Sequence, residues 1–114
     1  MSQEIKVTTR QKDSVGLVDI QGDVTAVTGE KIEEAYQEIT QKGLKKIVIV
    51  FDPECYINSG GIAILIGIAA ESSEQEQVIR ITGLSGHFQK IFSMMGLTKY
   101  TEIFPSEEAA LNGF

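Results

Sequence analysis

The sequence is poor in the residues that form disulfides and metal sites. It has one cysteine, Cys55, and one histidine, His87, and it lacks tryptophan. A single thiol excludes an intramolecular disulfide framework and suits a reducing compartment. One Cys with one His offers too few ligands for a zinc site. We therefore expect no metal ion and no cofactor.

Positive charge and long apolar runs are also scarce. Lys and Arg number 10 against 16 Asp and Glu, which gives a net charge of −6 without any cluster of basic residues. This composition disfavours a groove for nucleic acid.

The longest uncharged run, 55–70, is shorter than the roughly 20 apolar residues of a membrane span. The N-terminal "MSQEIKVTTRQKDS" lacks the apolar centre of a secretion signal. We expect a cytoplasmic protein without direct membrane insertion.

The sequence does contain alternating strand and helix patterns. Its 114 residues suit one domain over 1–114. Period-two and β-branched segments predict strands, and apolar residues at helical spacing predict helices between them. This alternation predicts an α/β fold with a mixed four- to five-stranded sheet covered by about four helices. The expected strands are 5–9, 15–20, 45–51, 78–82 and 100–104, with helices from Thr28 to Gly43, from Ser59 to Ala70, from Leu84 to Gly96, and after Ser106.

One stretch, "ECYINSGGIAILIGIAA" (54–70), places a serine and two glycines between a strand and an apolar helix. The turn after the strand crosses the carboxyl edge of the sheet, where α/β folds usually place their sites. We expect Ser59 to face solvent there, and either Asn58 or Ser59 could cap the helix. Gly60 and Gly61 each cost up to about 1 kcal/mol relative to alanine in a helix. Their presence predicts that something approaches this backbone closely.

A serine at a helix N-terminus is also well placed for phosphorylation. Free amides and the helix dipole favour a phosphate there, and the phosphate adds close to two negative charges to the surface. We therefore predict that Ser59 is a switch. The apolar helix behind it has two open interpretations. It is buried between the sheet and other helices, or one flank is exposed as a docking patch.

Other candidate sites are weaker. Cys55 and His87 could lie near the same edge, but no third group is indicated to orient them, so we predict no catalytic residues and no enzyme. The glycine pair lacks the "GxxxxGK[ST]" pattern of phosphate-binding loops, which makes nucleotide binding a weak option.

In the 84–96 helix, the spacing predicts burial of three residues and exposure of Met94. The three are Phe88, Phe92 and Met95.

Three segments resemble a known family. They are "VDIQGDVTAVTGEKIEEAY", "KKIVIVFDPECYINSGGIAIL" and "GLSGHFQKIFSMMGLTKYTEIFPSEEAAL". Together they resemble the STAS domain, named for sulfate transporters and anti-sigma factor antagonists, in its small stand-alone bacterial form. The second segment is the most specific, because it looks like the family's strand followed by a "D-S-[SA]-G-[IL]" loop. The likeness runs nearly end to end.

The resemblance implies a partner switch. The unmodified protein would bind an anti-sigma factor with serine kinase activity and so release the sigma factor. Phosphorylation of Ser59 would end that binding, and a serine phosphatase would restore it. Residues carried over as the partner-binding face are Asp23, Thr25, Asn58, Gly60, Gly61 and Ile62.

Two features depart from the family pattern and keep an alternative open. Asn58 stands where the family usually has an acidic residue, and Gly60 is the small residue after the serine. This lowers the local negative charge and bears on which kinase, if any, recognises the loop. The alternative is a STAS scaffold subunit of a stress-sensing assembly or of a lipid-transport ATPase complex.

Overall fold

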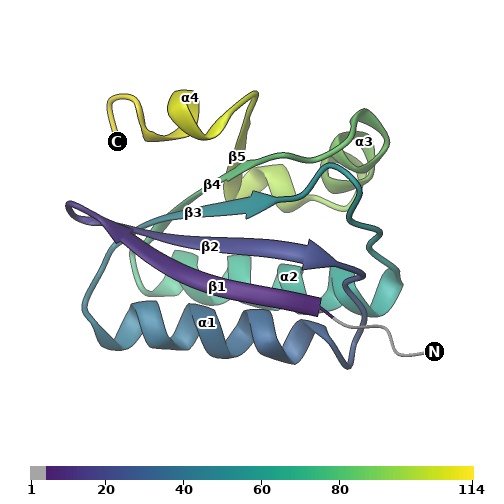
Figure 1. Cartoon of the computed structure of the whole chain (residues 1–114), viewed down its shortest axis with the longest axis horizontal. Helices are drawn as coiled ribbons and strands as arrows, with labels where there is room; N and C mark the ends of the chain where they lie inside the picture. The colour runs from purple at the N-terminus through teal and green to yellow at the C-terminus, as the bar shows by residue number, and fades with distance from the viewer. Residues whose placement is uncertain (1–4) are drawn as a thin grey trace.

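A computed structural model describes residues 5–114 and contains one five-stranded sheet (Figure 1). The strands follow chain order across the sheet. The first strand runs antiparallel to the second, and the other neighbours are parallel. This is the mixed sheet that the sequence predicts. The strands are β1 (Ile5–Lys12), β2 (Val15–Gly22), β3 (Lys46–Phe51), β4 (Val78–Thr82) and β5 (Thr101–Phe104).

The helices divide unequally between the two faces of the sheet. Each of the first three connects one parallel strand to its neighbour, always in the same direction across the sheet. Right-handed crossovers of this kind put all three helices on one face, and their apolar residues share one core cluster. The last helix lies over the opposite face (Figure 1). The helices are α1 (Gly29–Gln41), α2 (Ser59–Glu74), α3 (Gly86–Met94) and α4 (Glu107–Leu111), with a 3₁₀ turn η1 at Leu97–Lys99.

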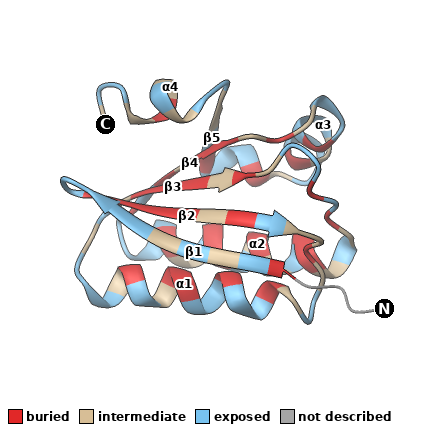
Figure 2. Cartoon of the chain, in the orientation of Figure 1, coloured by how far each residue is buried: buried red, intermediate tan, exposed pale blue. Residues whose placement is uncertain are grey.

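The main core lies between the sheet and α1, α2 and α3, and buried residues line the helix faces that meet the sheet (Figure 2). Phe51 at the end of β3 packs edge-on against Phe92, with ring centroids 6.1 Å apart. Phe88 and Phe92 are buried and Met94 is exposed, as the spacing predicts. The prediction for Met95 is wrong, because its side chain is 53% exposed. The Met95 amide still donates to the Ile91 carbonyl oxygen at 2.9 Å, so Met95 lies one turn after Ile91, on a side of the helix that the core covers only in part.

Two boundaries differ from the sequence prediction by more than two residues. The first hairpin is longer, since β1 pairs with β2 as far as Lys12 and only two residues form the turn. Polar residues on an exposed edge strand resemble a turn in sequence, which explains the short prediction. Helix α2 continues to Glu74, past the predicted end at Ala70. Between α2 and β4, Gln77 is buried and accepts a hydrogen bond of 2.6 Å from the Tyr36 hydroxyl.

Helix α4 is held on the second face by an arginine. The Arg80 guanidinium lies over the rings of Phe104 and Phe114, at 4.8 and 4.2 Å from their centroids. It also donates hydrogen bonds to the carbonyl oxygens of Ala110 and Asn112. A small apolar cluster packs beneath α4 and contains Val15, Leu17, Val48 and Ala110.

Candidate functional site

Two loops lie side by side at the carboxyl ends of β2 and β3. Val24, after β2, forms an isolated parallel bridge with Ile57, after β3. The Val24 amide donates to the Tyr56 carbonyl oxygen at 2.8 Å, and the Asn58 amide donates to the Val24 carbonyl oxygen at 3.0 Å. These backbone bonds extend the sheet pairing beyond the strands. They fix the position of the loop that leads into α2.

Asn58 is the residue that caps α2. Its side-chain oxygen accepts a hydrogen bond of 2.9 Å from the Gly61 amide. Ser59 is the first residue of the helix and is exposed, as the sequence predicts. Within residues 5–114, the Ser59 hydroxyl has no hydrogen-bond partner. The Ser59 hydroxyl therefore makes no hydrogen bond that holds the fold within residues 5–114, and another molecule can reach it.

The glycine pair makes room for the chain's own backbone. A Cβ atom built on Gly61 would lie 2.3 Å from the carbonyl oxygen of Val24, and one on Gly60 would lie 2.9 Å from the Ala26 Cβ. The predicted close approach is thus confirmed, and the group that approaches is the β2–α1 loop. Gly61 is buried and Ile62 is only 5% exposed. These two positions shape the site from beneath and offer little surface to a partner.

The β2–α1 loop uses its polar groups internally, with one exception. The Thr25 hydroxyl accepts hydrogen bonds from the amides of Val27 and Thr28, at 3.2 and 3.1 Å. The Thr28 hydroxyl donates to the Asp23 backbone carbonyl at 2.7 Å. The Asp23 carboxylate has no hydrogen-bond partner among residues 5–114. Asp23 therefore serves the turn through its backbone, and its half-buried side chain remains available for a contact.

Helix α2 has one buried side and one exposed side. Its large side chains Ile62, Leu65 and Ile68 are buried in the core. The opposite flank is exposed and made of small residues. This flank begins at the serine and continues through Ala63, Gly67 and Ala70.

An apolar groove adjoins Ser59, with a volume of about 260 Å³. We call it the Ser59 groove. Tyr56 is 58% exposed at its rim, and its ring packs edge-on against Phe88 at 5.9 Å between centroids. Sequence reasoning missed this feature, because helical spacing assigned Met95 to the core and Tyr56 gave no periodic signal. The groove is lined by Tyr56, Ile57, Asn58, Ser59, Ile62, Ile91 and Met95.

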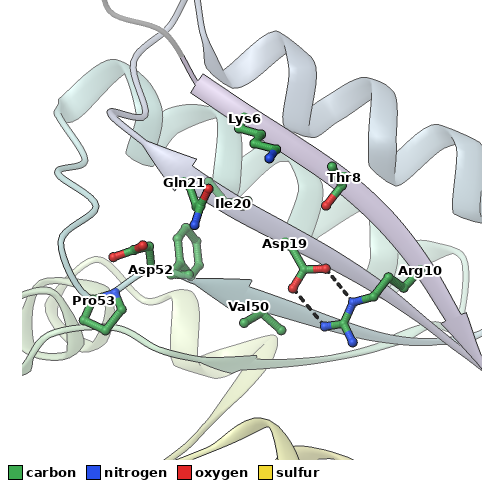
Figure 3. Close-up of a pocket in the computed structure, with 10 residues that line it drawn as sticks. Lys6, Thr8, Arg10, Asp19, Ile20, Gln21, Val50, Asp52 and Pro53 are labelled. Carbon is green, nitrogen blue, oxygen red and sulfur yellow. Dashed lines mark hydrogen bonds and ion pairs between the residues drawn. The ribbon is translucent and has the colours of Figure 1, made fainter.

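A second hollow, of about 540 Å³, lies on the part of the sheet that α4 leaves open (Figure 3). Lys6 and Arg10 project from β1, Asp19 from β2, and Asp52 follows β3. Arg10 binds both carboxylate oxygens of Asp19, at 2.6 and 2.8 Å, and also binds Glu107 of α4. Two cations and two anions line this hollow. Their charges cancel, so the hollow has no clear preference for a charged ligand.

The structure gives no support to chemistry at Cys55. The thiol is buried and donates to the Ile20 carbonyl oxygen at 3.4 Å. Burial raises the pKa of the Cys55 thiol, which works against forming a reactive thiolate. His87 is exposed and its ring lies beside Phe88. No three His, Cys, Asp or Glu residues gather as metal ligands within 5–114, and no helix there is long and apolar enough to cross a membrane.

Comparison with models of known protein families identifies one family. The model of the STAS domain matches residues 6–110. The anti-sigma-B factor antagonist of Staphylococcus aureus is 22% identical over 93 residues, which cover 82% of this chain and 86% of that protein.

Two solved structures have a similar fold. An anti-sigma factor antagonist from Mycobacterium paratuberculosis matches with a TM-score of 0.79 and 22% identity, covering 97% of this chain and 94% of that one. The Bacillus cell fate determinant SpoIIAA in its phosphorylated form matches with a TM-score of 0.65 and 17% identity, covering 91% and 96%.

Proposed function

We propose that this chain, which belongs to the STAS domain family, is an anti-sigma factor antagonist controlled by phosphorylation of Ser59. The unmodified protein binds an anti-sigma factor with serine kinase activity in the cytoplasm. Transfer of a phosphoryl group to the Ser59 hydroxyl ends the binding, and a serine phosphatase restores it. The observation that carries this proposal is the exposed Ser59 hydroxyl, which has no hydrogen-bond partner among residues 5–114.

The surroundings of Ser59 suit a modification that acts on a partner more than on the fold. Asn58 already caps α2, so the helix start does not depend on the serine hydroxyl. A phosphate at the first position of this 16-residue helix is compatible with the helix dipole. The same phosphate adds nearly two negative charges to the exposed surface. The expected effect is a changed surface on an unchanged fold.

The partner face in this proposal surrounds Ser59 on both loops. Asp23 offers a carboxylate with no hydrogen-bond partner within residues 5–114, and Asn58 and Gly60 flank the serine. Thr25, Gly61 and Ile62 belong to the same face mainly as supports, because their polar groups or side chains are used within the chain. The names of the similar proteins support the proposal, since two are anti-sigma factor antagonists and a third was solved in a phosphorylated form.

The experiment combines phosphorylation with binding. The chain is incubated with ATP and purified anti-sigma factor kinases from its own genome, and the modified residue is located by mass spectrometry. One phosphoryl group is expected, on Ser59. The Ser59→Ala variant should bind the kinase constitutively, and Ser59→Asp should bind more weakly.

A matched control uses the other end of the same helix. Ser73 is also an exposed serine of α2, so Ser73→Ala should change neither phosphorylation nor binding. Phosphate found at another residue, or equal affinity of wild type, Ser59→Ala and Ser59→Asp, would refute the switch.

A second candidate function is a STAS scaffold subunit of a stress-sensing assembly or of a lipid-transport ATPase complex. Asn58 favours it, because the resemblance leads us to expect an acidic residue before a regulated serine. Under this alternative, Ser59 stays unmodified with every kinase tested. The Asn58→Asp variant separates the two functions. Phosphorylation of this variant but not of the wild type would indicate that the wild-type loop is not a kinase substrate, which favours the scaffold.

A further inference from the structure

The Ser59 groove is apolar although it opens on a charged protein. Its seven lining residues include no charged side chain, whereas charged residues form 23% of the sequence. Two of its walls are large apolar groups left in water, since Tyr56 is 58% and Met95 is 53% exposed. Exposed apolar groups gathered around a hollow are characteristic of binding surfaces. Ser59 is itself one of the lining residues.

The walls of the groove are held in place by the core. Phe88 and Phe92 anchor α3 among buried residues, and the Tyr56 ring rests against Phe88. After α3, Gly96 adopts a left-handed conformation with φ of 83° and redirects the chain. Met95 is therefore presented at the edge of the groove by a fixed backbone. A preformed site of this kind costs little conformational entropy on binding.

We propose that the Ser59 groove receives an apolar side chain of the anti-sigma factor kinase, an inference that rests on the proposed function. The groove is continuous with the phosphorylated position, so a protein that reaches the Ser59 hydroxyl also covers the groove. Its 260 Å³ suits one aromatic or branched aliphatic side chain, because an apolar cavity of about 150 Å³ holds benzene in another protein. The absence of charge on the walls favours an apolar occupant.

This arrangement explains how one phosphate can release the partner. A phosphoryl group on Ser59 puts close to two negative charges on the wall of the groove. An apolar side chain seated there would strip water from the phosphate, and no Lys or Arg lines the groove to replace that water. The phosphorylated state of Ser59 and an apolar side chain in the groove therefore exclude each other. The switch needs no change of fold.

The test compares two neighbouring methionines. Met95 lines the groove, whereas Met94 is 81% exposed and does not line it. Affinity for the purified kinase is measured by isothermal titration calorimetry for wild type, Met95→Ala and Met94→Ala. Met95→Ala should weaken binding about tenfold or more, as loss of a central apolar contact does. Met94→Ala should stay within about twofold of wild type.

Three further measurements accompany this test, and the first two separate packing at the interface from damage to the fold. Met95→Leu keeps apolar volume and should restore most of the affinity. All variants should share the wild-type urea midpoint within error, because both methionines are exposed. The rate of Ser59 phosphorylation at low substrate concentration should fall in Met95→Ala in step with the affinity.

The possible outcomes distinguish this inference from the proposed function. If phosphorylation of Ser59 releases the kinase but Met95→Ala binds like Met94→Ala and wild type, the groove is not part of the interface and the inference is overturned. The switch would then stand without it. If the wild-type chain neither binds the kinase nor accepts phosphate, both fall together.

Discussion

The contact between α2 and the β2–α1 loop can be tested by adding one methyl group at either of two glycines of α2. In Gly61→Ala, the new Cβ would lie 2.3 Å from the Val24 carbonyl oxygen and 2.8 Å from its carbonyl carbon. These are backbone atoms that cannot rotate away. In Gly67→Ala, the new Cβ meets nothing within 4 Å. The two variants add the same group to the same helix, so they differ only in what that group contacts.

The expected changes in the free energy of unfolding have opposite signs in the two variants. Replacing a helical glycine with alanine stabilises by about 0.5–1 kcal/mol when no clash results, and this is the expectation for Gly67→Ala. At Gly61, overpacking costs about 1–3 kcal/mol, and the two hydrogen bonds of Val24 each contribute about 1 kcal/mol more if the loop is displaced. After subtraction of the gain in helix propensity, Gly61→Ala should lose about 2–4 kcal/mol of its free energy of unfolding.

Urea unfolding followed by circular dichroism measures both free energies of unfolding with one protocol. Wild type should fall between the two variants. If Gly61→Ala proved as stable as Gly67→Ala, the loop would not press against α2 as described. The account of how the serine is positioned would then fail.

Three other predictions test other parts of the structure. Arg80→Ala should lower the free energy of unfolding by about 1–3 kcal/mol, because it removes two ring contacts and two hydrogen bonds that hold α4, and a normal urea midpoint would contradict this. The Arg10 guanidinium lowers the pKa of Glu107, so this pair stabilises the fold above the ordinary glutamate pKa and its contribution disappears as the pH falls through the lowered value. Glu107→Gln should thus cost about 0.2–1 kcal/mol at neutral pH and progressively less in acid, as urea midpoints across pH would show. Cys55 should react with iodoacetamide far more slowly in the native chain than in urea, since it is buried with a raised pKa, and equal rates would show that the loop opens freely.

Much of the fold could be predicted because local pattern and tertiary role agree. The continuous β-branched run "KKIVIVF" predicts a central strand, and β3 is the middle strand of five. The exposure of Ser59 also followed from sequence, since a residue after a strand that opens a helix lies at the rim of an α/β sheet. The choice between Asn58 and Ser59 as the cap could not be made, because both residue types are good caps and only the backbone position decides.

The rest of the site depends on contacts between distant segments. Gly60 and Gly61 indicated a close neighbour, but only the structure identifies it as the loop at Val24. The Ser59 groove joins Tyr56 to Ile91 and Met95, which lie far from it in the chain. The spacing of apolar residues within one helix cannot detect a groove formed between two distant segments.

The central claim is that phosphate at Ser59 changes the surface a partner touches and leaves the fold intact. The most direct test measures the affinity of the anti-sigma factor kinase for the unmodified chain and for the chain phosphorylated at Ser59, side by side with the urea midpoints of both forms. We expect phosphorylation to weaken binding at least tenfold while the midpoint stays nearly constant. Equal affinity of the two forms, or loss of binding accompanied by loss of folded structure, would contradict the account.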